Sequence, residues 1–138
     1  MAWAAALGLA ALVSAGPAGA SAQQFPGDVR AVDAALGRLP AKTVVLDDFP
    51  ISGWLLWRHP DLTPVLDLRV EIYSSDQIAT YRRAERVGPG WLDIIQDTGA
   101  RHALLRTDSA LALALRERAA WTPLASTRDY VLLAAPTS

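Results

Sequence analysis

Short apolar runs alternate with amphipathic segments from residue 28 onward, and this alternation restricts the folds open to the chain. The β-branched run Thr43–Leu46 predicts a buried strand. The next segment places apolar residues at helical spacing, which predicts a helix. Further strands are predicted at Pro64–Leu68, Ala103–Leu105, Trp121–Ala125 and Tyr130–Ala134. Strand, helix, strand repetition predicts an α/β fold of three layers, with a mostly parallel sheet of four to five strands between helices.

Capping residues and prolines predict where the helices begin and end. Pro50 suits the first turn of a helix, and Pro60 disfavours helical backbone at His59, so that helix is predicted to end near His59. Polar side chains that accept hydrogen bonds from a first turn are predicted to begin the other helices. These residues are Asp28, Ser75 or Asp76, and Asp108. The short connection Ser126–Asp129 predicts that the last two strands form an antiparallel hairpin.

The first 27 residues differ from the rest because they carry no charged side chain. Ala2–Val13 is apolar, and Ala20-Ser21-Ala22 matches the site that a signal peptidase cleaves. The same run is consistent with the end of a transmembrane helix, or with an apolar core helix. We therefore expect an apolar N-terminal helix in residues 1–22, as a signal peptide or remnant transmembrane helix, then a linker at 23–27. A single α/β domain at 28–138 would then lie outside the cytoplasm.

Composition and motif content restrict the possible chemistry. The formal net charge of −1 gives no overall field that favours nucleic acid or anionic lipid. The chain has no Cys, which excludes disulfides and thiolate metal sites. His59 and His102 lack the spacing of metal ligands, and no nucleophile motif such as G-x-S-x-G is present. We therefore predict no catalytic residue, no metal site and no cofactor.

Polar and aromatic residues are concentrated between Asp47 and Tyr73. Asp47 and Asp48 follow the first predicted strand, at the end where open α/β sheets bind ligands. Two adjacent carboxylates there can bind a divalent cation. Alternatively, one of them caps the helix that begins at Pro50 and the other is solvated.

The second half of this segment alternates polar and apolar residues. If it is extended, Asp67, Arg69, Glu71 and Tyr73 lie on one face. Two acids beside an arginine can hold a sugar or a phosphate group. The structural alternative is an ion pair between Asp67 and Arg69 on a half-exposed strand.

Tryptophans in this segment offer a further candidate surface. Trp54 and Trp57 can form a platform on which a sugar stacks, because Trp presents a broad apolar face and one N–H group. The alternative is that both pack into the core. Trp91 and Trp121 are predicted to be core residues.

An ordered set of residues carries a resemblance to a known family. The set consists of Asp47, Asp48, Phe49, Gly53, Leu55, Trp57, Arg58, Pro64, Val65, Asp67, Arg69, Glu71 and Tyr73, followed in order by Trp91, the Leu111–Leu115 helix and Trp121. This pattern resembles the C-terminal extracytoplasmic domain of actinobacterial-type polytopic membrane proteins that are themselves similar to glycosyltransferases using lipid-linked sugars. The resemblance implies that the catalytic Asp lies in the membrane part of such proteins rather than in this domain.

Two positions depart from the family pattern. Its Gly-Gly is Ser52-Gly53 here, and the Gly of its Asp-Gly-Arg is replaced by Leu68. A Gly at such a position can permit close approach of the backbone to a ligand. Leu68 therefore argues against a catalytic site in this segment.

These observations predict an extracytoplasmic accessory domain that is not an enzyme by itself. It would be secreted or attached to the membrane through its N-terminal segment, and would bind or position a cell-envelope glycan, a lipid-linked sugar or a protein partner, but no nucleic acid. Candidate binding residues are Asp47, Asp48, Trp54, Trp57, Arg58, Asp67, Arg69, Glu71 and Tyr73. One alternative is a small metal-assisted hydrolase using Asp47, Asp48, Asp67 and Glu71. Another is a detached structural fragment with no independent activity.

Overall fold

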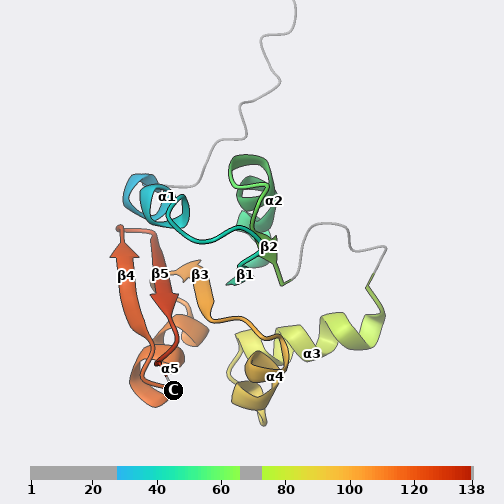
Figure 1. Ribbon diagram of the computed structural model, residues 1–138. Coiled ribbons are helices and arrows are strands. Elements are labelled where there is room, and N and C mark those ends of the chain that lie inside the picture. The colour runs from blue at the N-terminus through green and yellow to red at the C-terminus, as the bar shows by residue number, and fades with distance from the viewer. Residues whose placement is uncertain (1–27, 66–72, 138) are drawn as a thin grey trace, which may run out of the picture.

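The computed structural model describes residues 28–65 and 73–137 and shows a mixed sheet between two groups of helices (Figure 1). The described strands are β1 (Val44–Asp47), β2 (Thr63–Pro64), β3 (His102–Arg106), β4 (Thr122–Ser126) and β5 (Tyr130–Ala134). The described helices are α1 (Arg30–Leu36), α2 (Phe49–Arg58), α3 (Ser75–Glu85), α4 (Trp91–Asp97) and α5 (Ala110–Arg118). The predicted order of helices and strands is confirmed. The predicted second strand was longer than β2, and its residues 66–68 lie outside the described residues.

Strand order is β2-β1-β3-β5-β4. β1 is parallel to both β2 and β3, whereas β3 and β5, and β5 and β4, are antiparallel. The predicted hairpin of β4 and β5 is confirmed. The prediction of a mostly parallel sheet is wrong for the half formed by β3, β5 and β4. There β5 lies between β3 and β4 and is antiparallel to both. The hairpin therefore joins the sheet through its second strand, which runs opposite to β3.

The core has one part on each face of the sheet. Val45, Leu104 and Leu132 lie on the face that packs against α1 and α2. Leu46 and Leu105 lie on the opposite face, which packs against α3, α4 and α5. Successive strand residues thus enter opposite parts of the core, as the two-residue period of a strand requires. The three predicted layers are confirmed.

Helix positions follow the predicted apolar patterns closely. Val32 and Leu36 of α1 are buried, and α2 ends at Arg58 as the proline pattern predicted. Trp91 and Trp121, both predicted to be core residues, are buried. Local spacing was sufficient for these features because each helix presents its apolar residues on one face.

Three predicted helix caps are wrong by one or two residues. Ser74, rather than Ser75 or Asp76, caps α3: its Oγ accepts a hydrogen bond from the Gln77 N–H, and the Gln77 side chain accepts one from the Ser74 N–H. Ser109 caps α5 through the Ala112 N–H, while the predicted cap, Asp108, binds the Arg106 guanidinium. At α1 the N-cap position is occupied by Val29 without a side-chain cap, while the predicted cap, Asp28, lies one residue earlier and accepts from the Arg30 N–H.

The predicted leader and linker, residues 1–27, lie outside the described residues. Within the described ranges, every helix is too short or too polar to span a lipid bilayer.

Candidate functional site

Asp47 lies at the carboxyl end of β1 and is fully buried. Its Oδ1 accepts a hydrogen bond from the Val65 N–H at 3.1 Å, just after β2. Its backbone carbonyl accepts a hydrogen bond from the Tyr81 hydroxyl of α3. Asp47 therefore joins the sheet to the chain after β2 and to α3. It is neither solvated nor open to a ligand, which corrects the expectation that an Asp at this end would face solvent or a substrate.

Asp48 occupies the position just before α2, but its side chain does not cap that helix. Its Oδ2 instead accepts a hydrogen bond from the Arg106 N–H at 2.6 Å, at the end of β3. The predicted helix cap at this position is therefore wrong. Burial raises the pKa of the Asp48 carboxyl, and the nearby Asp108 adds to this effect, while the Arg106 N–H opposes it. Burial and the charge of Asp48 likewise raise the pKa of Glu85 on α3.

The raised pKa of Asp48 predicts a pH dependence of stability. An acid whose pKa is higher in the folded protein binds more protons there, so its contribution to stability falls as pH rises from about 3.9 through the folded value. We expect Asp48→Asn to remove this decline and to be at least as stable as the parent at pH 7. Asp48→Ala should lose about 1 kcal/mol, because the Arg106 N–H loses its acceptor. Urea denaturation of the three proteins between pH 4 and 7 measures both effects. A parent protein that gains stability relative to Asp48→Asn over this range would contradict the assignment.

The two tryptophans of α2 do not form a platform. Trp54 is buried in the core and forms a T-shaped pair with the His59 ring, with centroids 5.6 Å apart. Trp57 is 78% exposed. Sequence spacing could not separate these roles, because α2 has few polar positions that would mark its exposed face.

Arg58 binds α1 instead of the carboxyl end of β1. Its Nε and Nη2 each lie 3.0 Å from a carboxylate oxygen of Asp33. His59 Nε2 lies 2.8 Å from Asp33 Oδ1. The Arg58 hydrogen bond is the main cause that holds the pKa of Asp33 below its usual value; burial opposes it, and the His59 hydrogen bond, a smaller effect than burial, lowers the pKa further. Asp33 was not among the predicted residues, and its partners lie 25 and 26 residues away in sequence.

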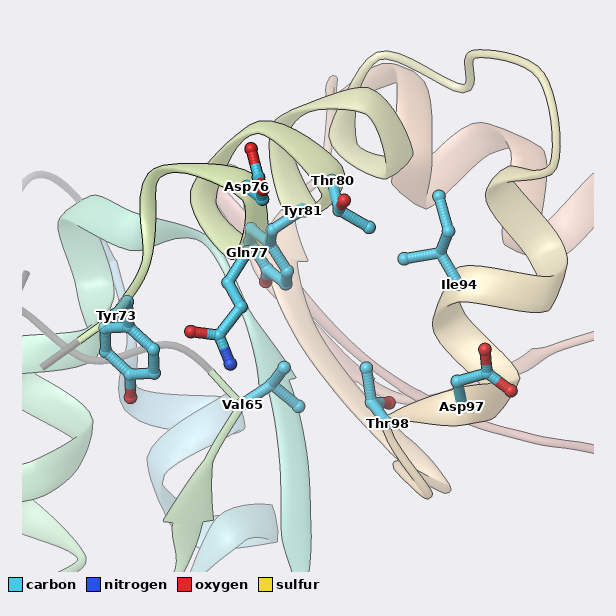
Figure 2. Close-up of a pocket in the computed structure, with 9 residues that line it drawn as sticks. All are labelled: Val65, Tyr73, Asp76, Gln77, Thr80, Tyr81, Ile94, Asp97 and Thr98. Carbon is cyan, nitrogen blue, oxygen red and sulfur yellow. The ribbon is translucent and has the colours of Figure 1, made fainter.

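Three predicted binding residues, Asp67, Arg69 and Glu71, lie outside the described residues. The next one, Tyr73, is described and lines a pocket of about 450 Å³. Figure 2 shows this pocket between α3, the end of α4 and Val65, which follows β2. Among the described residues that line this pocket, Tyr73 is the one that the sequence analysis named as a candidate binding residue.

The pocket combines apolar surfaces with oxygen-rich side chains (Figure 2). The apolar surfaces come from Val65, Ile94 and the rings of Tyr73 and Tyr81. The polar side chains are Asp76, Gln77, Thr80, Asp97 and Thr98. None of the described lining residues is basic. The lining therefore presents hydrogen-bond acceptors of negative or neutral charge beside aromatic surface.

Some of these polar groups already have partners. The Tyr81 hydroxyl donates to the Asp47 carbonyl, and Thr98 Oγ1 donates to the Ile95 carbonyl at 2.6 Å. Gln77 Oε1 accepts from the cap of α3, which leaves its amide NH₂ as the donor available to a ligand. The side chains that can turn to a ligand are thus the two carboxylates, the Gln77 NH₂ and the Thr80 hydroxyl.

Sequence reasoning missed most of this pocket because its residues look like ordinary helix surface. Asp76, Gln77 and Thr80 have the spacing of neighbours on one helical face, which was a usable signal. Asp97 belongs to a different helix, and only the packing of α3 against α4 brings it to the same pocket.

The metal-assisted hydrolase hypothesis depends on four carboxylates, of which Asp47 and Asp48 are described. They bind the backbone N–H groups of Val65 and Arg106 respectively. Within residues 28–65 and 73–137, no group of three or more His, Cys, Asp or Glu side chains is placed to hold a metal ion. Asp67 and Glu71 lie outside these ranges.

Comparisons with models of protein families, with curated proteins and with solved structures gave no match. The family resemblance therefore stays a prediction from the residues that carry it. The functional argument rests on the geometry of the pocket.

Proposed function

We propose that this chain is an extracytoplasmic, non-catalytic domain that binds a neutral glycan in the pocket between α3 and α4. The observation that carries the proposal is the combination, in one pocket of about 450 Å³, of the Tyr73 ring with carboxylate, amide and hydroxyl groups. Pockets of roughly 300 to 1,000 Å³ are typical of small-molecule sites. The uncharged leader and the family resemblance support the extracytoplasmic location and a role in positioning glycan for a glycosyltransferase-like membrane protein.

Sugar chemistry fits this lining. The C–H face of a pyranose packs on an aromatic ring, here Tyr73, because the ring offers a broad apolar surface. Sugar hydroxyls donate to carboxylates, and such charge-assisted hydrogen bonds are stronger than neutral ones. Asp76 and Asp97 provide these acceptors, and the Gln77 NH₂ provides a donor for a ring or hydroxyl oxygen.

The charge of the lining selects among glycans. Two carboxylates with no basic residue in the described lining disfavour a uronic acid or a sugar phosphate. A lipid-linked sugar would therefore place its phosphate outside this pocket. Binding rather than catalysis is proposed because the hydroxyls of Tyr81 and Thr98 donate to backbone carbonyls, so neither is prepared as a nucleophile.

The proposal predicts that Asp97→Asn weakens glycan binding and that Asp93→Asn does not. Both are exposed carboxylates of α4, but only Asp97 lines this pocket. We expect a roughly tenfold loss for Asp97→Asn, because a charge-assisted hydrogen bond becomes a neutral one. Calorimetric titration of the full chain with a panel of neutral and acidic oligosaccharides measures the effect. The titration includes a detergent without sugar groups, which keeps the apolar N-terminal segment in solution and does not compete with the oligosaccharides for the pocket.

Equal effects of the two substitutions would show that the pocket is not the binding site. Preference for acidic over neutral oligosaccharides would contradict the charge argument. A folded protein that binds no member of the panel would overturn the proposal itself.

A further inference from the structure

The outer face of α3 carries a second hollow, which is separate from the proposed glycan pocket. It has a volume of about 590 Å³, and three arginines, Arg82, Arg83 and Arg86, line it. Its remaining lining residues are Ser75, Ile78, Ala79 and Gly88. None of these seven residues lines the glycan pocket, so the two sites use different faces of one helix.

None of the three guanidinium groups forms an ion pair within 4 Å with a carboxylate of the described part of the chain. Arg82, Arg83 and Arg86 are all exposed. The acid that lies among them in sequence is Glu85, which is partly buried. Burial and the charge of Asp48 raise its pKa and outweigh the charges of Arg82 and Arg86, which lower it. Positive charge is therefore concentrated around the hollow, although the whole chain has a formal net charge of −1.

Gly88 leaves space for the stem of one of these arginines. A Cβ atom at residue 88 would lie 2.8 Å from Arg83 Cγ and 3.2 Å from the Arg83 carbonyl oxygen. The Gly88 N–H also donates to that carbonyl at 2.9 Å, and Val87 before it has a φ of 57°, in the left-handed region. The turn after α3 thus brings a residue without a side chain against the stem of Arg83. A larger residue at position 88 would displace that stem.

Helix electrostatics alone do not account for this arrangement. The carboxyl end of a helix attracts cations, which explains basic residues in the last turn of α3. It explains neither the space that Gly88 leaves for the Arg83 stem nor the presence of three arginines in the lining of one hollow.

We propose that this hollow binds a phosphate group. A guanidinium presents a planar set of donors that matches phosphate oxygens, and three of them provide enough positive charge to bind a phosphate dianion. The Ile78 and Ala79 side chains supply an apolar part of the lining, suited to the carbon chain that adjoins a phosphate ester. The phosphate belongs either to the headgroup of an anionic lipid or to a soluble ester. This site does not depend on the proposed glycan pocket.

The test compares two double variants of the full chain that remove the same charge. Arg82→Gln with Arg86→Gln removes two guanidinium groups of the hollow, and Arg38→Gln with Arg116→Gln removes two exposed ones elsewhere. The probes are vesicles of phosphatidylglycerol, vesicles of phosphatidylcholine, and glycerol phosphate in solution. Vesicle binding is measured by flotation and glycerol phosphate binding by NMR titration. Because residues 2–13 are apolar and can bind vesicles by themselves, the readout is the difference between the variants.

We expect the hollow variant to bind phosphatidylglycerol vesicles, glycerol phosphate or both about tenfold less tightly than the parent and the control variant. Loss confined to phosphatidylglycerol vesicles assigns the phosphate to a lipid headgroup, and loss with glycerol phosphate assigns it to a soluble ester. Gly88→Ala leaves the charge unchanged and should also weaken binding, because it moves Arg83. Equal loss in the two double variants, no loss in either, or unchanged binding in Gly88→Ala would overturn the proposal.

Discussion

Replacement of Trp54 by alanine is expected to lower the free energy of unfolding by about 3–5 kcal/mol, whereas Trp57→Ala should change it by less than about 0.5 kcal/mol. Trp54 is 9% exposed and packs with the core that α1 and α2 share with the sheet, so its removal leaves a large cavity. Trp57 is three residues further along the same helix and is 78% exposed. Guanidinium denaturation followed by far-ultraviolet circular dichroism measures both values without relying on Trp fluorescence.

This pair also tests where the glycan binds. Loss of glycan binding in Trp57→Ala, with stability unchanged, would move the site from the α3–α4 pocket to the end of α2. Equal destabilisation by the two substitutions would contradict the described orientation of α2.

Asp47→Ala is expected to destabilise the protein by about 1–3 kcal/mol, because a fully buried side chain and one of the two acceptors of the Val65 N–H are removed. The Val65 N–H then keeps the Val45 carbonyl at 2.9 Å but loses the carboxylate that it binds at 3.1 Å, and the fully buried site keeps a small cavity. Asp47→Asn keeps an acceptor of nearly the same shape and should cost less than Asp47→Ala. Urea denaturation of the three proteins at pH 7 gives the two differences.

The same variants address the hydrolase hypothesis. If Asp47 joins strands and helix as its contacts indicate, Asp47→Asn should leave glycan binding unchanged. An Asp47→Asn protein of full stability that loses binding of a divalent cation, measured by calorimetry on the parent and the variant, would instead support a metal-assisted role.

Local patterns predicted most of the secondary structure. The stripe of Val32 and Leu36, the end of α2 before His59 and the β4–β5 hairpin all depend on residues a few positions apart. Periodicity, proline and turn length act over that range, so sequence is sufficient for them. Helix caps were less predictable, because several neighbouring polar residues can act as the cap of one helix. At α3 a single hydrogen bond distinguishes Ser74 from Ser75.

The candidate site was predicted much less well. Tyr73 lies in the pocket, whereas Trp54 is buried in the core. Arg58 binds Asp33. Asp47 and Asp48 accept hydrogen bonds from backbone N–H groups. Polar residues at a strand end have many possible partners. Which partner they bind depends on neighbouring strands and helices that sequence spacing does not place.

By itself, the sequence determined the alternating elements and the apolar faces of the helices, because both depend on residues close together in the chain. That alternation in turn predicted the three layers. The tertiary structure decided that β5 lies beside β3, that Asp48 meets Arg106 across 58 residues, and that α3 separates an acidic pocket from a basic hollow. These features depend on how distant segments pack. The free energy of packing is shared among many residues, and no short stretch of sequence contains it.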